Sequence, residues 1–225
     1  MSKLAPKSIA ILVLTLCPLV LFAQAAERGK LSIADFDEGE AIGLFSVSSR
    51  DPMDENQWIK MNWDHDDAIG KAGGKSLRLD YDVDSNESAK ATFWMRLNDQ
   101  DLSQYDTLHL YLKGSEGSRG NITVQFVDGN YHPSPYVIGR IEDHWKEFQI
   151  PLKRFTRIHD WSAIQEFDIV IDDMNAIPKE GSLWVDEISV SSRKAKESSI
   201  PKRESNGVIG KSNTNQNSTG GEYVQ

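Results

Sequence analysis

The stretch Ser76-Leu-Arg-Leu-Asp-Tyr-Asp-Val83 alternates apolar and polar side chains without interruption. In an extended chain successive side chains point to opposite faces, so such a stretch forms a strand with one buried and one wet face. Its apolar members share one face: Leu77, Leu79, Tyr81 and Val83. The same alternation recurs in four further segments: 91–97, 107–113, 121–127 and 167–172.

Turn residues separate these segments, as at Gly73-Gly74 and Asp128-Gly129-Asn130, and no stretch between residues 26 and 190 shows a long helical period. A sheet that is apolar on one face must bury that face against another layer. The sequence therefore predicts an all-β sandwich, one domain over residues 26–190.

The last apolar segment, Leu183-Trp-Val-Asp-Glu-Ile-Ser-Val190, breaks the alternation by one residue. Leu183 and Val185 share a face, and Ile188 and Val190 resume it after an extra residue. This shift predicts a β-bulge at Asp186-Glu187. A bulge changes the direction of side chains, which makes it a suitable place for a carboxylate that binds a ligand.

The N-terminus has the pattern of an export signal, with Lys3 and Lys7 before an uncharged apolar run that ends in Ala23-Gln24-Ala25. We expect residues 1–25 to be a signal peptide, cleaved after Ala25, and the mature protein to be periplasmic or secreted. A membrane anchor is the alternative, but the run is short for one. A lipoprotein signal at Cys17 is disfavoured because Leu16 stands where a small residue is expected.

The C-terminal segment 191–225 is rich in Ser, Asn, Lys and Gly and poor in large apolar residues, which predicts a disordered tail. Cys17 is the only cysteine, so no disulfide is expected.

The chain carries 34 acidic and 25 basic residues, a net charge of −9. Nucleic acid is therefore not expected as a partner, because phosphate binding needs a positive surface.

Five motifs, in this order, resemble the galactose-binding-like jelly rolls, especially family 11 carbohydrate-binding modules and the complex I intermediate-associated protein domain. The motifs are Ile33–Glu38, Gly73–Leu79, Asp106–Gly114, Trp145–Leu152 followed by Phe155, and Leu183–Val190. The resemblance spans residues 31–190 and implies a jelly-roll β-sandwich.

The resemblance also implies a structural calcium ion between the first and last strands. The matching positions are Asp35, Asp37 or Glu38, and Asp186. Calcium prefers hard oxygen ligands, some of them backbone carbonyls. The alternative is that these carboxylates only cap turns on an acidic surface.

The polar faces of the middle strands carry aromatic and planar polar side chains, which suit the C–H faces and hydroxyl groups of a sugar. The predicted ligand residues are Trp94, Arg96, His109, Tyr111, Gln125, Tyr136 and Arg140. If the strands that hold them are neighbours, they form one patch. The alternative is that a loop covers the aromatic residues, or that they make core contacts.

No catalytic motif is evident: the five histidines are scattered, and there is no Gly-x-Ser-x-Gly elbow. We therefore expect a non-catalytic, exported protein that binds a poly- or oligosaccharide and has no membrane span after signal cleavage. The alternative is an exported protein-interaction or assembly factor of the complex I intermediate-associated type.

Overall fold

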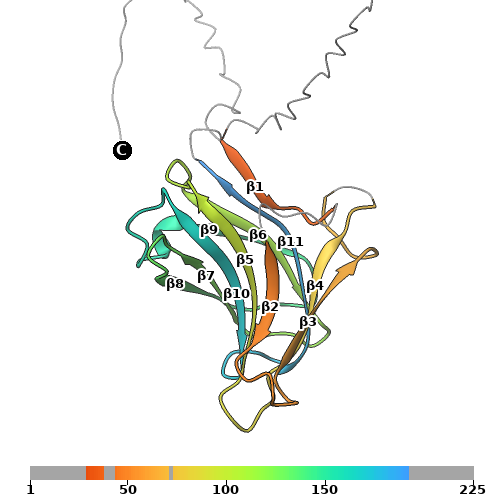
Figure 1. Cartoon of the computed structure of the whole chain (residues 1–225). Coiled ribbons are helices and arrows are strands. Elements are labelled where there is room, and N and C mark those ends of the chain that lie inside the picture. Colours follow the sequence, from red (N-terminus) through yellow and green to blue (C-terminus); the bar gives the residue numbers. More distant parts are fainter. Residues whose placement is uncertain (1–28, 38–43, 71–72, 193–225) are drawn as a thin grey trace, which may run out of the picture.

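The computed structural model describes residues 29–37, 44–70 and 73–192 as two antiparallel β-sheets packed face to face (Figure 1). The predicted signal peptide, Glu38 and the tail from residue 193 onward lie outside the described residues. Within the described part, no helix is long and apolar enough to cross a bilayer. The all-β sandwich that the alternation predicts is confirmed.

The first sheet, sheet A, has six strands in the order β3-β4-β11-β6-β9, with β1 also paired to β11. Its strands are β1 (Lys30–Ala34), β3 (Trp58–Asp64), β4 (Ser76–Asp82), β6 (Thr107–Gly114), β9 (Lys146–Pro151) and β11 (Glu180–Ser191). A single 3-10 turn among the described residues, η1 (Leu152–Arg154), follows β9.

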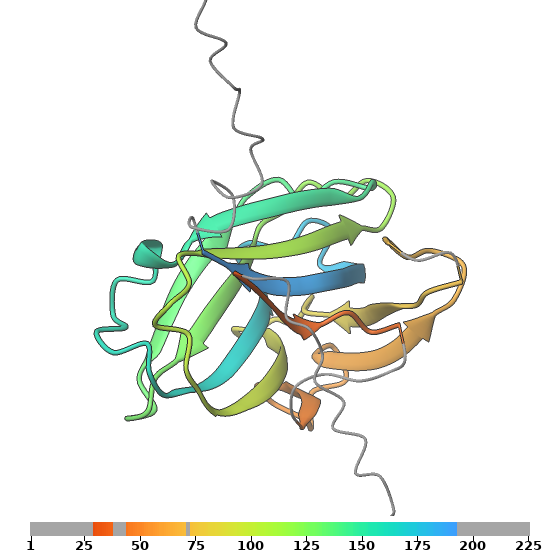
Figure 2. The ribbon, with the colours of Figure 1, turned by 90° about the horizontal axis from the view of Figure 1, so that it is seen from above.

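The second sheet, sheet B, has five strands in the order β2-β5-β10-β7-β8. Its strands are β2 (Phe45–Ser49), β5 (Lys90–Gln100), β7 (Ile122–Val127), β8 (Pro133–Ile138) and β10 (Ile164–Asp172). Figure 2 shows the two layers from above, with blue β11 in one and cyan β10 in the other.

The apolar residues of the alternating strands fill the space between the sheets. Leu77 and Leu79 of β4 and Phe93 of β5 are completely buried, while their polar neighbours face outward. Phe126 of β7 packs at the centre of an aromatic group, with its ring centroid 5.0 Å from that of Phe155. The period-two pattern thus assigns each side chain of these strands to its face correctly.

β11 is the strand that joins the parts of sheet A. Its first half pairs with β4, its second half pairs with β1, and β6 lies along its other edge. The predicted bulge is confirmed: the register to β6 shifts between Asp186 and Ser189, and Glu187 has a φ of 50°. β11 ends at Ser191, the first residue of the segment predicted as tail.

Candidate functional site

The predicted sugar patch is divided between the two outer faces of the sandwich. β5 and β7, which hold Trp94 and Gln125, belong to sheet B, whereas β6, which holds His109 and Tyr111, belongs to sheet A. Because outward side chains of opposite sheets point in opposite directions, the expectation of one continuous patch is wrong.

The outer face of sheet B brings the remaining polar and aromatic residues together. Strand register places a central row across all five strands, one residue from each. The row runs Ser46, Trp94, Asp168, Gln125 and Pro135. Neighbouring strands lie about 4.8 Å apart, so the row extends over roughly 19 Å.

Trp94 is the only aromatic residue of this row, and its side chain is partly exposed. The guanidinium carbon of Arg96 lies 5.8 Å from its ring centroid, within range of a cation–π contact. Arg96 also lies 3.8 Å from a carboxylate oxygen of Glu166 on the adjacent strand β10. The indole therefore lies beside a cation that can donate hydrogen bonds, a combination that suits a sugar-binding surface.

Asp168 was not among the predicted ligand residues, yet it occupies the middle of the row. It is only 5% exposed, and its Oδ2 accepts a hydrogen bond of 2.6 Å from Nε2 of Gln125. Burial raises the pKa of its carboxyl to about 6. The alternation places Asp168 on the outer face, but only the strand order reveals that it lies between Trp94 and Gln125.

Of two further predicted ligand residues, one points away from this surface and the other lies past the end of β8. Tyr136 of β8 points to the inner side of the sheet, where its ring packs 5.9 Å from that of Phe155. Arg140 is exposed beyond the end of β8, and its backbone N–H donates to the side chain of Asn121. The prediction for Tyr136 is wrong because β8 continues the alternation with tyrosine on its inner face.

On the outer face of sheet A, both ring nitrogens of His109 make hydrogen bonds. Its Nδ1 lies 3.0 Å from Glu147 Oε1 on β9, and its Nε2 lies 2.7 Å from Ser191 Oγ on β11. Tyr111 lies on the same face, and the pKa of its phenol is raised. The largest cause is burial, followed by the negative charges of Glu147 and Glu187. These residues form a network within sheet A.

The end of β3 and the loop that follows it contact another part of this face. Asp64 accepts a 2.8 Å hydrogen bond from Trp184 Nε1, and Asp67 accepts a 2.6 Å hydrogen bond from Trp145 Nε1. Asp67 also pairs with Lys113, which lies 4.9 Å from the Trp184 ring centroid. Two carboxylates of the segment Asp64-His-Asp-Asp67 thus accept indole N–H groups, and one of them also pairs with a lysine of β6.

The candidate calcium residues are brought together in part. Asp186 is completely buried at the bulge, and its two oxygens accept the backbone N–H groups of Ile69 and Glu187. Burial, followed by the charges of Glu187 and Asp37, raises the pKa of Asp186 to about 7. Asp35 is exposed.

Within the described ranges, no three His, Cys, Asp or Glu side chains are grouped closely enough to hold a metal ion. Asp37 and Asp186, however, lie near enough for their charges to interact. A cation would offset both that repulsion and the burial of Asp186, and calcium can complete its shell with backbone oxygens. This pair therefore fits a hard cation.

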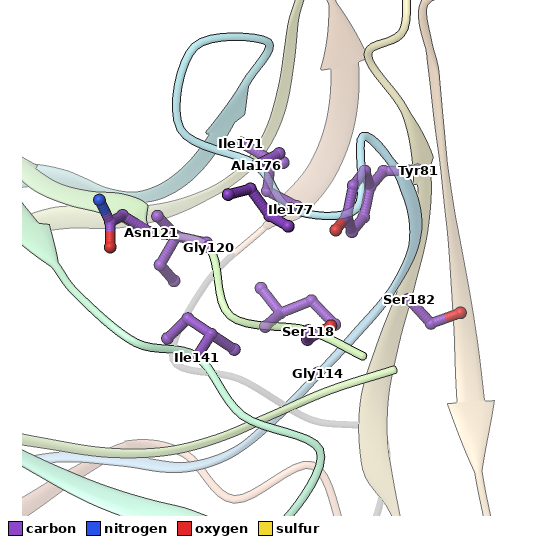
Figure 3. A pocket seen from close by; sticks show the side chains of 12 residues that line it. Tyr81, Gly114, Ser118, Gly120, Asn121, Ile141, Ile171, Ala176, Ile177 and Ser182 are labelled. Atoms are coloured by element: carbon purple, nitrogen blue, oxygen red, sulfur yellow. The ribbon is translucent and has the colours of Figure 1, made fainter. Parts of the chain in front are cut away.

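A pocket of about 270 Å³, including space open to solvent, lies between the sheets at one end of the sandwich (Figure 3). Its lining is largely aliphatic, as at Ile141, Ile171 and Ile177. The hydroxyl of Tyr81 at its wall donates to the carbonyl of Pro178 at 3.0 Å. Among the residues that the structure describes, no charged side chain lines this pocket, which makes it a poorer sugar site than the sheet B face.

Several solved structures share this fold at low sequence identity. A family 11 carbohydrate-binding module of a cellulosomal cellulase of Clostridium thermocellum has a TM-score of 0.53 and 15% identity, covering 73% of this chain and 95% of its own. The family 11 module from Clostridium thermocellum in complex with a β-1,3-1,4-mixed-linked tetrasaccharide has a TM-score of 0.54 and 16% identity. The match covers 73% of this chain and 96% of that module. A crystal structure of a family 30 carbohydrate-binding module has a TM-score of 0.52 and 19% identity. The match covers 72% of this chain and 98% of that module.

These similarities establish the jelly-roll sandwich that the sequence motifs imply. No curated protein matches the sequence. Residues 39–192 match the family described as carbohydrate binding domain 30, and this match includes every strand of the described fold except β1. The chain thus belongs to the carbohydrate-binding domain 30 family.

Proposed function

We propose that the outer face of sheet B is the surface through which this carbohydrate-binding module binds a poly- or oligosaccharide. The observation that carries the proposal is the partly exposed Trp94 on β5, next to the middle strand of a five-strand face, with Arg96 beside it and Gln125 two strands away. An aromatic face flanked by planar hydrogen-bonding groups matches the C–H and hydroxyl surfaces of a pyranose.

The ligand to test first is a β-1,3-1,4-mixed-linked glucan, because a module of similar fold has been solved in complex with a tetrasaccharide of that linkage. Isothermal titration with the wild type should give a Kd on the order of micromolar to millimolar. Trp94→Ala should weaken binding at least tenfold with little change in melting temperature, because the indole is partly exposed.

Tyr111→Ala is the matched control, since it removes an aromatic side chain from the outer face of the other sheet. It should bind glucan as the wild type does. Equal binding by Trp94→Ala and the wild type would move the site away from sheet B. Binding of a protein partner but no glycan would favour the alternative, an assembly factor.

We further propose that the domain is non-catalytic. Ser191, His109 and Glu147 have the hydrogen-bond order of a hydrolase triad. A serine nucleophile also needs backbone N–H donors for the oxyanion, commonly that of the following residue. Here the N–H of Ser192 already donates to the carbonyl of Gly29 at 2.8 Å. A fluorophosphonate probe should therefore leave Ser191 unlabelled.

A structural calcium ion is also part of the proposal. Asp186 and Asp37 would hold it, and its positive charge would offset the repulsion between the two carboxylates.

We also propose that the protein is exported to the periplasm or the medium. Export would follow from cleavage after Ala25, and Edman sequencing of the secreted protein would test it.

A further inference from the structure

Asp168 is a buried carboxylate in the centre of the proposed glycan face. It lies on β10, the middle strand of sheet B, and pairs in register with Trp94 of β5 and Gln125 of β7. Its 5% exposure contrasts with the partial exposure of both flanking side chains. An acidic residue is seldom buried without a partner for each oxygen.

The two oxygens of Asp168 differ in their partners. Oδ2 accepts the hydrogen bond from Gln125, whereas the buried Oδ1 has no hydrogen-bond partner among the described residues. An ionised carboxylate oxygen that is buried without a donor costs free energy. Asp168 Oδ1 is therefore an acceptor that a ligand could satisfy.

The charges around Asp168 come from its own strand and from β5. Glu166 raises the pKa of Asp168, and Lys90 lowers it, both more weakly than burial. Arg96 is paired with Glu166, and Asp172 lies on the same outer face. The facing residues of β7 are uncharged, Thr123 and Gln125. Together with Asp168 itself, this part of the face holds three carboxylates and two cations, which do not favour an additional anion.

We propose that Asp168 determines the specificity of the glycan face: Oδ1 accepts a hydrogen bond from a hydroxyl of a neutral sugar, and its charge excludes sugars that carry carboxylate or sulfate groups. The proposal rests on the proposed function of sheet B. For a hydroxyl to reach the buried Oδ1, a flanking side chain such as Gln125 or Trp94 must change rotamer, a movement that is common at binding surfaces.

A pH dependence follows from this contact. With its pKa at about 6 in the free protein, Asp168 is largely protonated at pH 5 and ionised at pH 8. Since the ionised form is the better acceptor, the affinity for a neutral glycan should rise as the pH rises through about 6 and then level off.

The test is titration calorimetry of the full chain with β-1,3-1,4-glucan and with the carboxymethylated form of the same glucan, at pH 5 and pH 8. We expect the wild type to bind the neutral polymer about tenfold more tightly at pH 8, a typical value for a hydrogen bond to a charged group, and to reject the carboxymethylated polymer. Asp168→Asn should bind weakly at both pH values and discriminate less.

Glu166→Gln is the matched control, because it removes a negative charge from the same strand and face without removing the buried acceptor. It should keep the pH dependence, with a slightly lower midpoint because Glu166 raises the pKa of Asp168. Gln125→Ala removes a hydrogen bond that lowers the pKa of Asp168, so it should move the midpoint of the pH profile upward. The melting temperature of each variant verifies that it is folded.

The outcomes separate the two proposals. If Asp168→Asn binds like the wild type, or if wild-type affinity is equal at pH 5 and pH 8, the role of Asp168 is overturned while glycan binding stands. If the wild type binds neither polymer nor any other glycan at either pH, the proposed function itself is overturned, and this inference with it.

Discussion

Trp94 and Tyr111 lie on opposite outer faces of the sandwich, although both belong to the polar faces of consecutive strands. β5 and β6 follow each other in sequence but are incorporated into different sheets. A sugar stacked on Trp94 therefore cannot touch Tyr111. Substitution of Tyr111 should therefore leave the binding of a sugar on Trp94 unchanged.

Tyr136→Ala should reduce stability and not glycan binding, because Tyr136 packs on the inner side of β8 against Phe155. Loss of a partly buried aromatic ring should lower the free energy of unfolding by about 2–3 kcal/mol, somewhat less than for a fully buried ring. Chemical denaturation measures this change. Weaker glucan binding in a stably folded variant would contradict the inward placement.

Trp145→Phe should lower the free energy of unfolding by about 1–3 kcal/mol, because it removes the N–H that donates to Asp67. Trp184→Phe should do the same through Asp64. Urea denaturation of both variants tests whether the contacts of the end of β3 and of the loop after it stabilise the fold. Two variants as stable as the wild type would show that these hydrogen bonds contribute nothing net.

Gly120→Ala should lower the free energy of unfolding by at least about 1–3 kcal/mol. A Cβ at this position would meet the backbone N of Ile177 at 2.4 Å and the backbone O of Asn175 at 2.7 Å. Gly139→Ala is the control, since its Cβ would meet only a side-chain oxygen of Asn121 at 3.3 Å. Thermal melts of the two variants should differ by several degrees.

Calcium should raise the melting temperature of the full chain, and a chelator should reverse the change. An ion that binds only the folded state adds about 2.7 kcal/mol at a hundredfold excess over its Kd. Asp186→Ala should abolish the difference. Identical melts of the wild type with calcium and with chelator would argue against the site.

Without added calcium, stability should fall as the pH rises from about 4 to 7. The carboxyl of Asp186 has its pKa raised from 3.8 to about 7, so in this window the folded state binds more protons than the unfolded state. Stability then decreases with pH, and the loss is complete above pH 7. Asp186→Asn should show a flatter pH profile in thermal melts, with the part due to Asp168 remaining.

Local patterns predicted the face of most side chains. Alternation alone places Phe93 and Trp94 on opposite faces of β5, because the extended backbone imposes a period of two. The bulge at Asp186-Glu187 was also predicted, since one extra residue between apolar positions has no other solution in a strand. These predictions need no knowledge of neighbouring strands.

The alternation of apolar and polar residues is enough to predict an all-β sandwich and the side chains of each strand that face the core. Which outward faces meet depends on how the strands are ordered in space. Strand order depends on long-range pairing between segments far apart in the chain, as for β5, β10 and β7. That pairing separates His109 and Tyr111 from Trp94 and places Asp168 between Trp94 and Gln125, where burial changes the chemistry of its carboxyl.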